Sequence, residues 1–310
     1  MLLLALLLDV VFGEPPERFH PVVWMGRGLA WLEARAPCSA TTATAPGRFA
    51  CCAARLGYGA IAALGSAAAW GCAAGLVERL APWPVQALLL KPAFAGRALL
   101  EAAAHVEKSL RTSELLEARQ GLSALVSRPT AELSPSLVAA AAIESLAENL
   151  VDSWVAPLLA YGGFGLAGAY VYRAANTADA MWGYRTPTYE HLGKTAARVD
   201  DLLTFVPARL GAILLILAGP RARDSLSVWR QDSRRTPSPN AGQPIAAAAG
   251  HLRVRLEKTG VYVLNAPAPE PTVHDLEAAR VLVARAMLVA ALLALAASAA
   301  RPAHSIASHV

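Results

Sequence analysis

The chain has 310 residues, of which 55% are hydrophobic and 16% are charged. Soluble domains average about 25% charged residues, so this composition argues against an ordinary soluble protein and favours a membrane protein. The formal net charge is +5, but no recognition motif or aromatic interleaving accompanies the basic residues, so we do not expect a nucleic-acid partner. The four cysteines show no metal-ligand spacing, and we expect packing roles for them rather than a disulfide framework.

Two apolar segments lie in the first quarter of the chain. Residues 1–12 ("MLLLALLLDVVF") have no basic residues before them and no small-residue cleavage site after them, so they predict an uncleaved anchor. Residues 56–77 carry no charge and are long enough to cross the ~30 Å hydrocarbon core as a helix. Within them, Gly71 and Gly75 form a small-xxx-small pair that would allow close contact with another helix.

The later apolar segments are interrupted by polar residues. Residues 202–219 and 281–300 are long enough to span, although each contains an arginine, and residues 85–100 are short. Residues 137–171 could span only if their acidic residues face protein or water. We therefore expect about four or five spans in one membrane-embedded domain of residues 1–310. The predicted fold class is all-α: a multi-pass integral membrane protein with amphipathic helices and polar loops.

Polar segments separate these spans. Residues 13–49 open with a proline-rich turn, and residues 96–136 predict two amphipathic helices that end at Pro129. Residues 220–280 are rich in lysine and arginine, which places them on the cytoplasmic side. Within that stretch, residues 236–260 predict a turn followed by a helix that starts near Pro244 and runs to Lys258.

An acidic stripe marks the apolar segment "AAAAIESLAENLVDSWVAPLL" at residues 139–159. Glu144, Glu148 and Asp152 are four residues apart, and a four-residue step turns only ~40° around a helix, so they share one face. Unpaired carboxylates in an apolar setting need cations or water. The stripe therefore predicts a cation or polar-substrate site, with Mg²⁺ or Ca²⁺ suited to its oxygens; a narrow solvated face is the alternative.

A second polar cluster lies in residues 172–210. It mixes carboxylates for a metal, guanidinium groups for phosphate or carboxylate, and amides for orientation, which favours an anionic, phosphate-bearing substrate. A salt-bridged helix beside the membrane is the alternative, and Arg198 and Asp201 are spaced to pair on one. In residues 236–260, Asn240 and Gly242 lie where a turn meets a helix N-terminus, a place that can hold phosphate. No Walker A, GxGxxG or GxSxG sequence occurs.

Several blocks in one order resemble a known family. They are "LDVVFGEPPERFHPVVWMG", "IESLAENLVDSWVAPL", "YRAANTADAMWGY", "GKTAARVDDLLTFVPARL" and "PSPNAGQPIAAAAGHLRVRLEK". Together they are similar to adenosylcobinamide-phosphate synthases, the cobalamin-biosynthesis family known as CbiB or CobD. Two positions depart from that pattern: Glu14 stands where the family usually has Asp, and Pro129 stands where an acidic residue would follow Arg128.

The resemblance implies an enzyme of the prokaryotic plasma membrane, an ATP-dependent acid–amine ligase. Such enzymes join aminopropanol, or its phosphate, through an amide to a propionate of adenosylcobyric acid, a corrinoid, and consume ATP with Mg²⁺. Membrane lipid is a further expected partner, and the sequence leaves open a homo-oligomer or association with other enzymes of the pathway. A transporter for a divalent cation or an organic amine is the alternative, since intramembrane acidic stripes are typical of ion pathways.

The resemblance and the residue types together assign expected roles. Carboxylates suited to metal binding or proton transfer are Glu144, Glu148, Asp152, Asp179, Asp200 and Asp201, of which the first three are the expected Mg²⁺ ligands. Side chains expected to bind substrate or phosphate are Arg173, Asn176, Lys194, Arg198, Arg209, Asn240, Gly242, Asn149 and His20.

Overall fold

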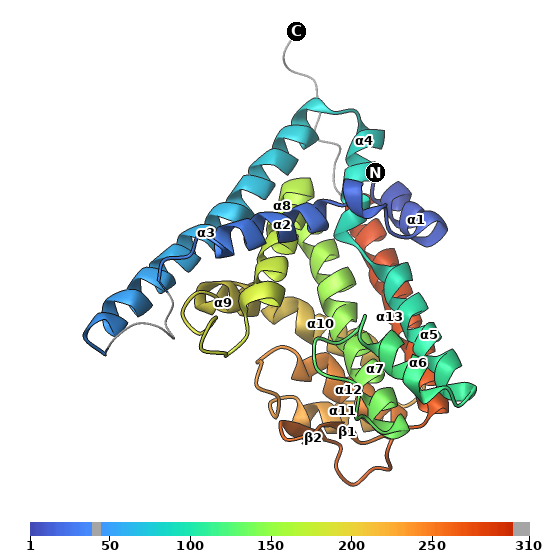
Figure 1. Cartoon of the computed structure of the whole chain (residues 1–310). Coiled ribbons are helices and arrows are strands. Elements are labelled where there is room, and N and C mark those ends of the chain that lie inside the picture. Colours follow the sequence, from blue (N-terminus) through green and yellow to red (C-terminus); the bar gives the residue numbers. More distant parts are fainter. Residues whose placement is uncertain (39–44, 300–310) are drawn as a thin grey trace.

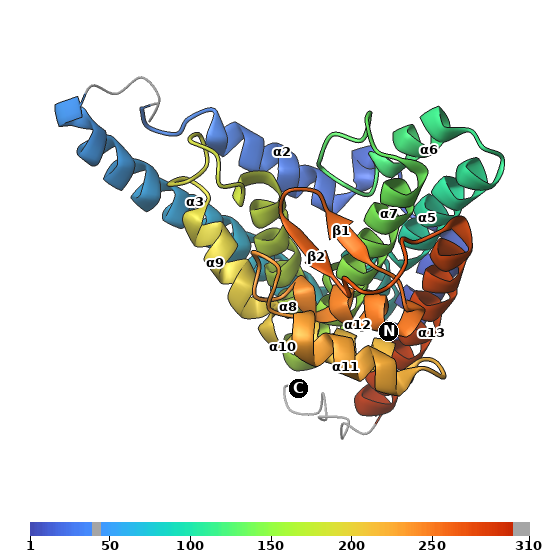
Figure 2. The same ribbon diagram turned by 90° about the horizontal axis from the view of Figure 1, so that it is seen from below.

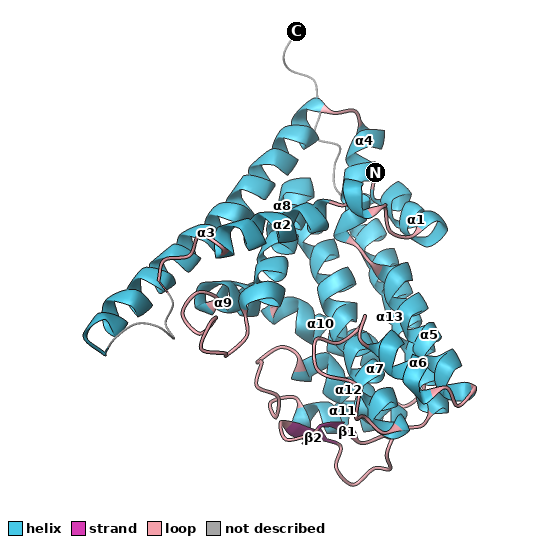
Figure 3. Ribbon diagram, viewed as in Figure 1, coloured by secondary structure: helices cyan, strands magenta, loops and turns pink. Residues whose placement is uncertain are grey.

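A computed structural model of the chain describes residues 1–38 and 45–299. Nearly all of its regular structure is helical (Figure 3), which confirms the predicted all-α class. The longer helices are α1 (Leu2–Phe12), α2 (Pro21–Glu33), α3 (Ala45–Leu80), α4 (Trp83–Leu90), α5 (Gly96–Arg111), α6 (Leu115–Leu122), α7 (Pro135–Leu150), α8 (Ala156–Trp182), α9 (Lys194–Leu203), α10 (Phe205–Leu217), α11 (Ala222–Asp232), α12 (Gly242–Leu252) and α13 (Val273–Ala299). A two-stranded antiparallel hairpin pairs β1 (Leu256–Lys258) with β2 (Tyr262–Leu264).

Three helical segments in the described residues are long and apolar enough to cross a membrane: Phe49–Leu80, Pro135–Trp182 and Val273–Ala299. Their length and composition mark the chain as a membrane protein. The expected span at 202–219 is wrong, because the helix breaks at Thr204 and leaves α10 with 13 residues, or ~20 Å. Helix α1 is shorter still, so two of the expected spans are short apolar helices instead.

The central element is the helical segment from Pro135 to Trp182. Ser134 caps its start by accepting a hydrogen bond from the backbone N–H of Leu137 at 3.3 Å. Helix α7 passes into α8 through one π-helical turn, Val151–Val155, and α8 is kinked at Gly165, whose φ is +67°. At the kink, Glu78 of α3 accepts a hydrogen bond from the backbone N–H of Leu166. The segment Pro135–Trp182 is therefore helical throughout, although its polar residues suggested an interruption; we call it the central rod.

The other elements surround the rod. Figure 1 shows α1 and α4 at one end of the molecule and α11, α12 and the hairpin at the other, with α8, α13 and α5 running between them. Helix α3 packs along α8, and α13 packs along α7 and α5. Seen from below, the hairpin lies beside α7 (Figure 2), and its β1 strand contacts that helix. The buried core between these helices consists mostly of alanine and leucine, including Ile143, Leu146 and Leu150 of α7.

Two local expectations need correction. The helix after Pro244 ends at Leu252, not Lys258, because Arg253 takes a left-handed conformation with φ 58° and the chain turns into the β1–β2 hairpin around Gly260. Cys38 and Cys51 form a disulfide, so the expectation that the cysteines only pack is wrong for this pair; Cys52 and Cys72 are free. The second amphipathic helix ends earlier than expected, at Leu122.

The predicted close contact at Gly71 and Gly75 is confirmed. A Cβ atom at Gly71 would lie 2.4 Å from Cγ2 of Val171, and one at Gly75 would lie 3.5 Å from Cβ of Ala167. Gly65, on the same helix, has nothing within 4 Å. The absence of a side chain at Gly71 therefore sets how closely α3 and α8 approach, which matters where no hydrophobic effect drives helices together.

This contact gives a stability prediction. We expect Gly71→Leu to destabilise the protein by about 1–3 kcal/mol, the range for overpacking a close contact. The thermal midpoint in detergent, followed by circular dichroism, measures the effect. Gly65→Leu is the matched control and should leave the midpoint nearly unchanged. Equal midpoints for the two variants would contradict the role assigned to Gly71.

Candidate functional site

A polar cleft opens where the rod meets the end of α9 and the starts of α10 and α12. It has a volume of about 500 Å³, and the carboxyl groups of Glu148, Asp152, Asp179, Asp200 and Asp201 line it. Five of the six predicted carboxylates thus meet in one cavity although three come from the rod and two from α9. The basic side chains that line it are Arg185 and Lys258. This excess of acid over base fits a site that receives cations.

Glu144 is the carboxylate that the structure leaves out of this cavity. It is buried, and Arg128 and Lys258 approach its two oxygens at 3.4 Å and 3.7 Å. The phenol of Tyr262 also contacts Glu144, and burial followed by the nearby Glu144 charge raises the pKa of Tyr262 well above its usual value. These partners come from the loop before α7 and from the hairpin, so Glu144 joins the hairpin to the rod. A small pocket of about 100 Å³ connects it to Glu148.

A π-helical turn interrupts the acidic stripe after Glu148. Glu144 and Glu148 lie in regular α-helix, whereas Asp152 lies in the wider turn Val151–Val155. Single π-turns inside α-helices occur often at functional sites, because the extra residue re-aims the side chains around it. Asp152, within the π-turn, lines the same cleft as Glu148, whereas Glu144, one helical turn earlier, meets Lys258 of the hairpin.

Asp200 is held from two sides inside the cleft. The Asn176 amide donates to its Oδ1 at 3.2 Å, and the Thr204 hydroxyl donates to its Oδ2 at 3.4 Å. Burial, and then the neighbouring Asp201, raise the pKa of Asp200 to about 6 despite these hydrogen bonds. Burial also raises the pKa of Asp201, although Arg198 and Arg185 oppose it. Both groups lie on α9, beside the membrane-length helices.

The start of α12 forms the opposite wall of the cleft. Both polar atoms of the Asn240 side chain are already hydrogen-bonded within the protein. Its amide nitrogen donates to the Asp201 carbonyl at 2.7 Å, and its Oδ1 accepts from Arg209 at 3.1 Å. Asn240 therefore fixes α12 against α9 and α10. A Cβ at Gly242 would lie 2.3 Å from the carbonyl oxygen of Ser233, so this glycine serves close packing. Ser238, which we did not predict, accepts from the backbone N–H of Asn240 and lines the cleft.

A basic side pocket adjoins the cleft. It has a volume of about 370 Å³ and shares Gly183, Tyr184, Arg185, Ala197 and Asp201 with the cleft. Lys194 and Arg198, both predicted, line it together with Arg185. Lys194 pairs with Glu190 at 3.3 Å, and Arg198 pairs with Asp201 at 3.9 Å, both at exposed positions. Such surface pairs are weak, so the two cations remain available to a stronger anion.

Three other predicted residues lie apart from the cavity lining. Arg173 donates to the backbone carbonyl of Asp152 at 3.3 Å. Asn149 donates to the Ser145 carbonyl at 3.0 Å. His20 caps α2 and lies 2.8 Å from Glu14, which also meets Lys91 at 2.8 Å. In this structure these side chains support the helices around the cleft.

The donor set suits magnesium in one specific way. Among residues 1–38 and 45–299, no group of three or more His, Cys, Asp or Glu side chains is arranged to hold a metal ion unaided. Mg²⁺ usually binds through one or two carboxylates plus waters and substrate phosphates. A cleft with several half-buried carboxylates beside a basic pocket therefore fits a metal that arrives with a phosphate-bearing substrate.

Comparison with known proteins identifies the family. Residues 2–297 match the CobD/Cbib protein family. The chain belongs to this family. It is 39% identical over 274 residues to a probable cobalamin biosynthesis protein CobD of Methanothermobacter thermautotrophicus, covering 86% of each chain. Cobalamin biosynthesis proteins CobD of Dehalococcoides mccartyi (39% over 277 residues, 85% of each chain) and Geobacter metallireducens (40% over 281 residues, 89% of this chain and 86% of the relative) are similar as well. No solved structure matches the chain.

Membership of the CobD/CbiB family gives the cleft its context. Four of the blocks that resemble the family supply the residues that line the cleft. Glu148, Asp152 and Asp179 come from the rod, Asp200 and Asp201 come from α9, and Asn240 comes from the segment just before α12. The sequence analysis did not single out Thr204 and Ser238, and it gave Arg185 and Lys258 no site role of their own, only places in the polar cluster and at the end of a helix. Lys258 lies in the block "PSPNAGQPIAAAAGHLRVRLEK", whose pattern predicts it at the end of a helix. In the structure it lies on strand β1, which faces the rod.

The raised pKa of Asp200 gives a pH prediction. A carboxyl group whose pKa rises on folding, here from 3.8 to about 6, stabilises the native state below pH ~4 and loses that contribution as the pH rises through 6. We expect Asp200→Asn to remove this loss, and thus to raise stability at pH 7.5 by at most about 3 kcal/mol. Thermal midpoints at pH 5 and pH 7.5, without added metal, measure it. Glu132→Gln, at an exposed position, is the control, and a lower midpoint for Asp200→Asn at pH 7.5 would contradict the prediction.

Proposed function

We propose that this protein forms an amide between an amino alcohol and a carboxylate of a corrinoid, using ATP, in cobalamin biosynthesis. The amine is aminopropanol or its phosphate, and the acid is a propionate of adenosylcobyric acid. Membership of the CobD/CbiB family supports the pathway. The observation that carries the reaction is the cleft, in which half-buried carboxylates lie beside a pocket lined by Arg185, Lys194 and Arg198. We place the enzyme in the prokaryotic plasma membrane.

The chemistry needs activation of the acid before the amine can attack. A carboxylate oxygen of the corrinoid would attack the terminal phosphorus of ATP, so that an acyl phosphate forms and ADP leaves. The amine nitrogen would then attack the acyl carbon, and the C–O bond to phosphate would break to give the amide and inorganic phosphate. Arg185, Lys194 and Arg198 would bind phosphate oxygens, since guanidinium groups suit phosphate geometry. Mg²⁺, held by Glu148 and Asp152 with the phosphates, would offset negative charge during phosphoryl transfer.

A base must remove a proton from the attacking ammonium group. Asp200 is well suited, because its pKa of about 6 lies near the operating pH and its oxygens are oriented by Asn176 and Thr204. Asp179 and Asp201 complete the acidic wall and would hold the ammonium group before it loses the proton. We assign Asp200 as the general base of this proposal.

One assay tests the reaction. Purified protein is incubated in detergent with adenosylcobyric acid, aminopropanol phosphate or aminopropanol, and Mg·ATP, and mass spectrometry detects the amide product. We expect product from the native protein, none from Glu148→Ala or Asp201→Ala, and full activity from Glu132→Ala. Asp200→Asn should lose about 10²–10⁴-fold in rate, the usual contribution of a general base. Full activity of both alanine variants would refute the site, and no product from native protein, with cation flux in proteoliposomes, would favour the transporter.

Metal binding gives a separate test of the same cleft. Mn²⁺ can substitute for Mg²⁺ and is visible by electron paramagnetic resonance. We expect ADP to raise Mn²⁺ affinity at least about tenfold, because the cleft has too few converging ligands of its own and the phosphates complete the shell. Glu148→Gln and Asp152→Asn should each abolish this enhancement, whereas Glu144→Gln should retain it. Loss in the Glu144 variant alone would show that the metal lies beside the hairpin instead.

A further inference from the structure

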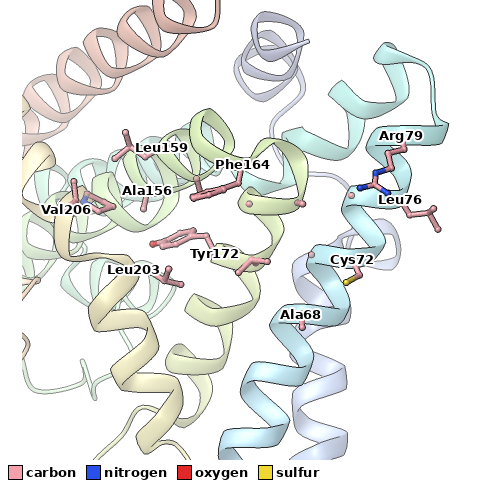
Figure 4. A pocket seen from close by; sticks show the side chains of 17 residues that line it. Ala68, Cys72, Leu76, Arg79, Ala156, Leu159, Phe164, Tyr172, Leu203 and Val206 are labelled. Atoms are coloured by element: carbon pink, nitrogen blue, oxygen red, sulfur yellow. The ribbon is translucent and has the colours of Figure 1, made fainter. Parts of the chain in front are cut away.

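A long apolar groove runs between two membrane-length helices on the face away from the hairpin. Residues 68–79 of α3 and residues 156–172 of α8 form its sides, and Leu203 and Val206 close it (Figure 4). Its volume is about 1030 Å³, at the upper end of the range for ligand pockets. Both sides belong to segments long and apolar enough to cross a membrane. The groove therefore lies at the depth of lipid chains.

The lining chemistry excludes a polar substrate. The side chains that carry a polar atom are Cys72, Arg79 and Tyr172; all the others are glycine, alanine, proline or hydrocarbon. A nucleotide or a corrinoid carboxylate needs many hydrogen-bond partners once it leaves water. Leu76, Phe164 and Val206 expose more than half of their surface here, and exposed apolar patches of this kind on a membrane protein meet hydrocarbon. The groove thus suits a hydrocarbon chain.

The two ends of the groove differ. Arg79 lies at the outer end, close to the end of the membrane-length segment Phe49–Leu80, is exposed, and has no ion-pair partner among the described residues. Tyr172 closes the inner end, and its buried hydroxyl completes no hydrogen bond there, although the Thr204 side chain lies beside it. Beyond Tyr172 the carboxylates of Asp152 and Asp200 belong to the polar cleft. The groove is therefore cationic at its outer end and closed at its inner end.

Its length matches one leaflet of a bilayer. From Ala68 to Arg79 the helix rises eleven residues, or ~16 Å at 1.5 Å per residue. Half of a ~30 Å hydrocarbon core is about the same length. A chain lying along the groove would start beside Arg79 and reach the bilayer midplane near Tyr172.

We propose that this groove binds an anionic phospholipid, with one acyl chain between α3 and α8 and its phosphate beside Arg79. The positive side chain supplies the charge complementarity, since basic residues at a membrane surface attract anionic lipids. Gly71 and Gly75 also line the groove, at the positions where α8 approaches α3 most closely. The proposal does not depend on the amide-forming activity, because none of the groove residues lines the polar cleft.

Photo-crosslinking tests the position of the chain. The full-length protein is placed in phosphatidylcholine nanodiscs that contain phosphatidylglycerol with a photoactivatable group midway along one acyl chain, and labelled peptides are mapped by mass spectrometry. We expect labels on residues 68–79 and 156–172, lost in Cys72→Phe but retained in Leu292→Phe, an exposed site on α13. Equal labelling of all lipid-facing helices, or labels unaffected by Cys72→Phe, would overturn the proposal. So would efficient Cys72–Cys72 cross-linking in the membrane, which would place a second copy in the groove.

Headgroup preference tests Arg79. Native mass spectrometry of the detergent-solubilised protein compares retention of phosphatidylglycerol with that of phosphatidylcholine. We expect Arg79→Gln to lower the preference for phosphatidylglycerol about fivefold, the effect of one basic residue at a membrane surface. Arg27→Gln, an exposed arginine on α2, is the matched control and should leave the preference unchanged. An unchanged preference in Arg79→Gln, or an equal loss in Arg27→Gln, would refute the assigned headgroup contact.

Discussion

The structure depends on how carboxylates within apolar helices are compensated. Charge removed from water costs several kcal/mol unless an opposite charge or a hydrogen bond meets it. In this protein, long-range partners supply that compensation. Glu144 meets Arg128 and Lys258 from outside its helix, Asp9 meets Lys91, and Glu78 accepts a backbone N–H at the kink in α8. The Glu144 pairings join the rod to the hairpin and to the loop before α7, the Glu78 contact joins α3 to α8, and the Asp9 pairing joins α1 to the segment after α4.

The carboxylates that form the cleft outnumber the basic side chains that line it, although Asp200 accepts hydrogen bonds from Asn176 and Thr204 and Asp201 pairs with Arg198. Glu148, Asp152 and Asp179 come from the rod, and Asp200 and Asp201 come from α9, which the rod positions. Their mutual repulsion opposes folding, and the cation or ammonium group of the proposed reaction would relieve it. Active sites often lower the stability of the folded protein, because like charges are held close together there. A ligand of opposite charge then binds to groups that are already in position. The side pocket beside these carboxylates is lined by Arg185, Lys194 and Arg198. A ligand with both a cationic and an anionic group could therefore place each one beside residues of opposite charge.

Local sequence patterns predicted much of this. Spacing of four residues placed Glu144 and Glu148 on one face, and the pair Gly71 and Gly75 predicted a close helix contact that α8 provides. What local patterns could not predict was long-range pairing. The partners of Glu144 are 16 and 114 residues away in sequence. The π-turn at Val151–Val155 has no distinctive sequence, and "LRVRLEK" satisfies helical periodicity as readily as a short strand. The sequence predicts Arg209 as an interruption of a span, since its hydrogen-bond partner, Asn240, is 31 residues away, just before α12.

The π-turn has a consequence for how this chain can vary over evolutionary time. It adds one residue to the rod between the half that carries Glu144 and the half that packs on α3. A one-residue insertion or deletion that the turn did not absorb would rotate all of α8 by ~100°, which would turn Ala167 and Val171 away from the glycines of α3. Substitutions within Val151–Val155 can be tolerated one at a time, but a change of length cannot. The spacing between the two halves of the rod should therefore be more constant among relatives than the residues that fill it.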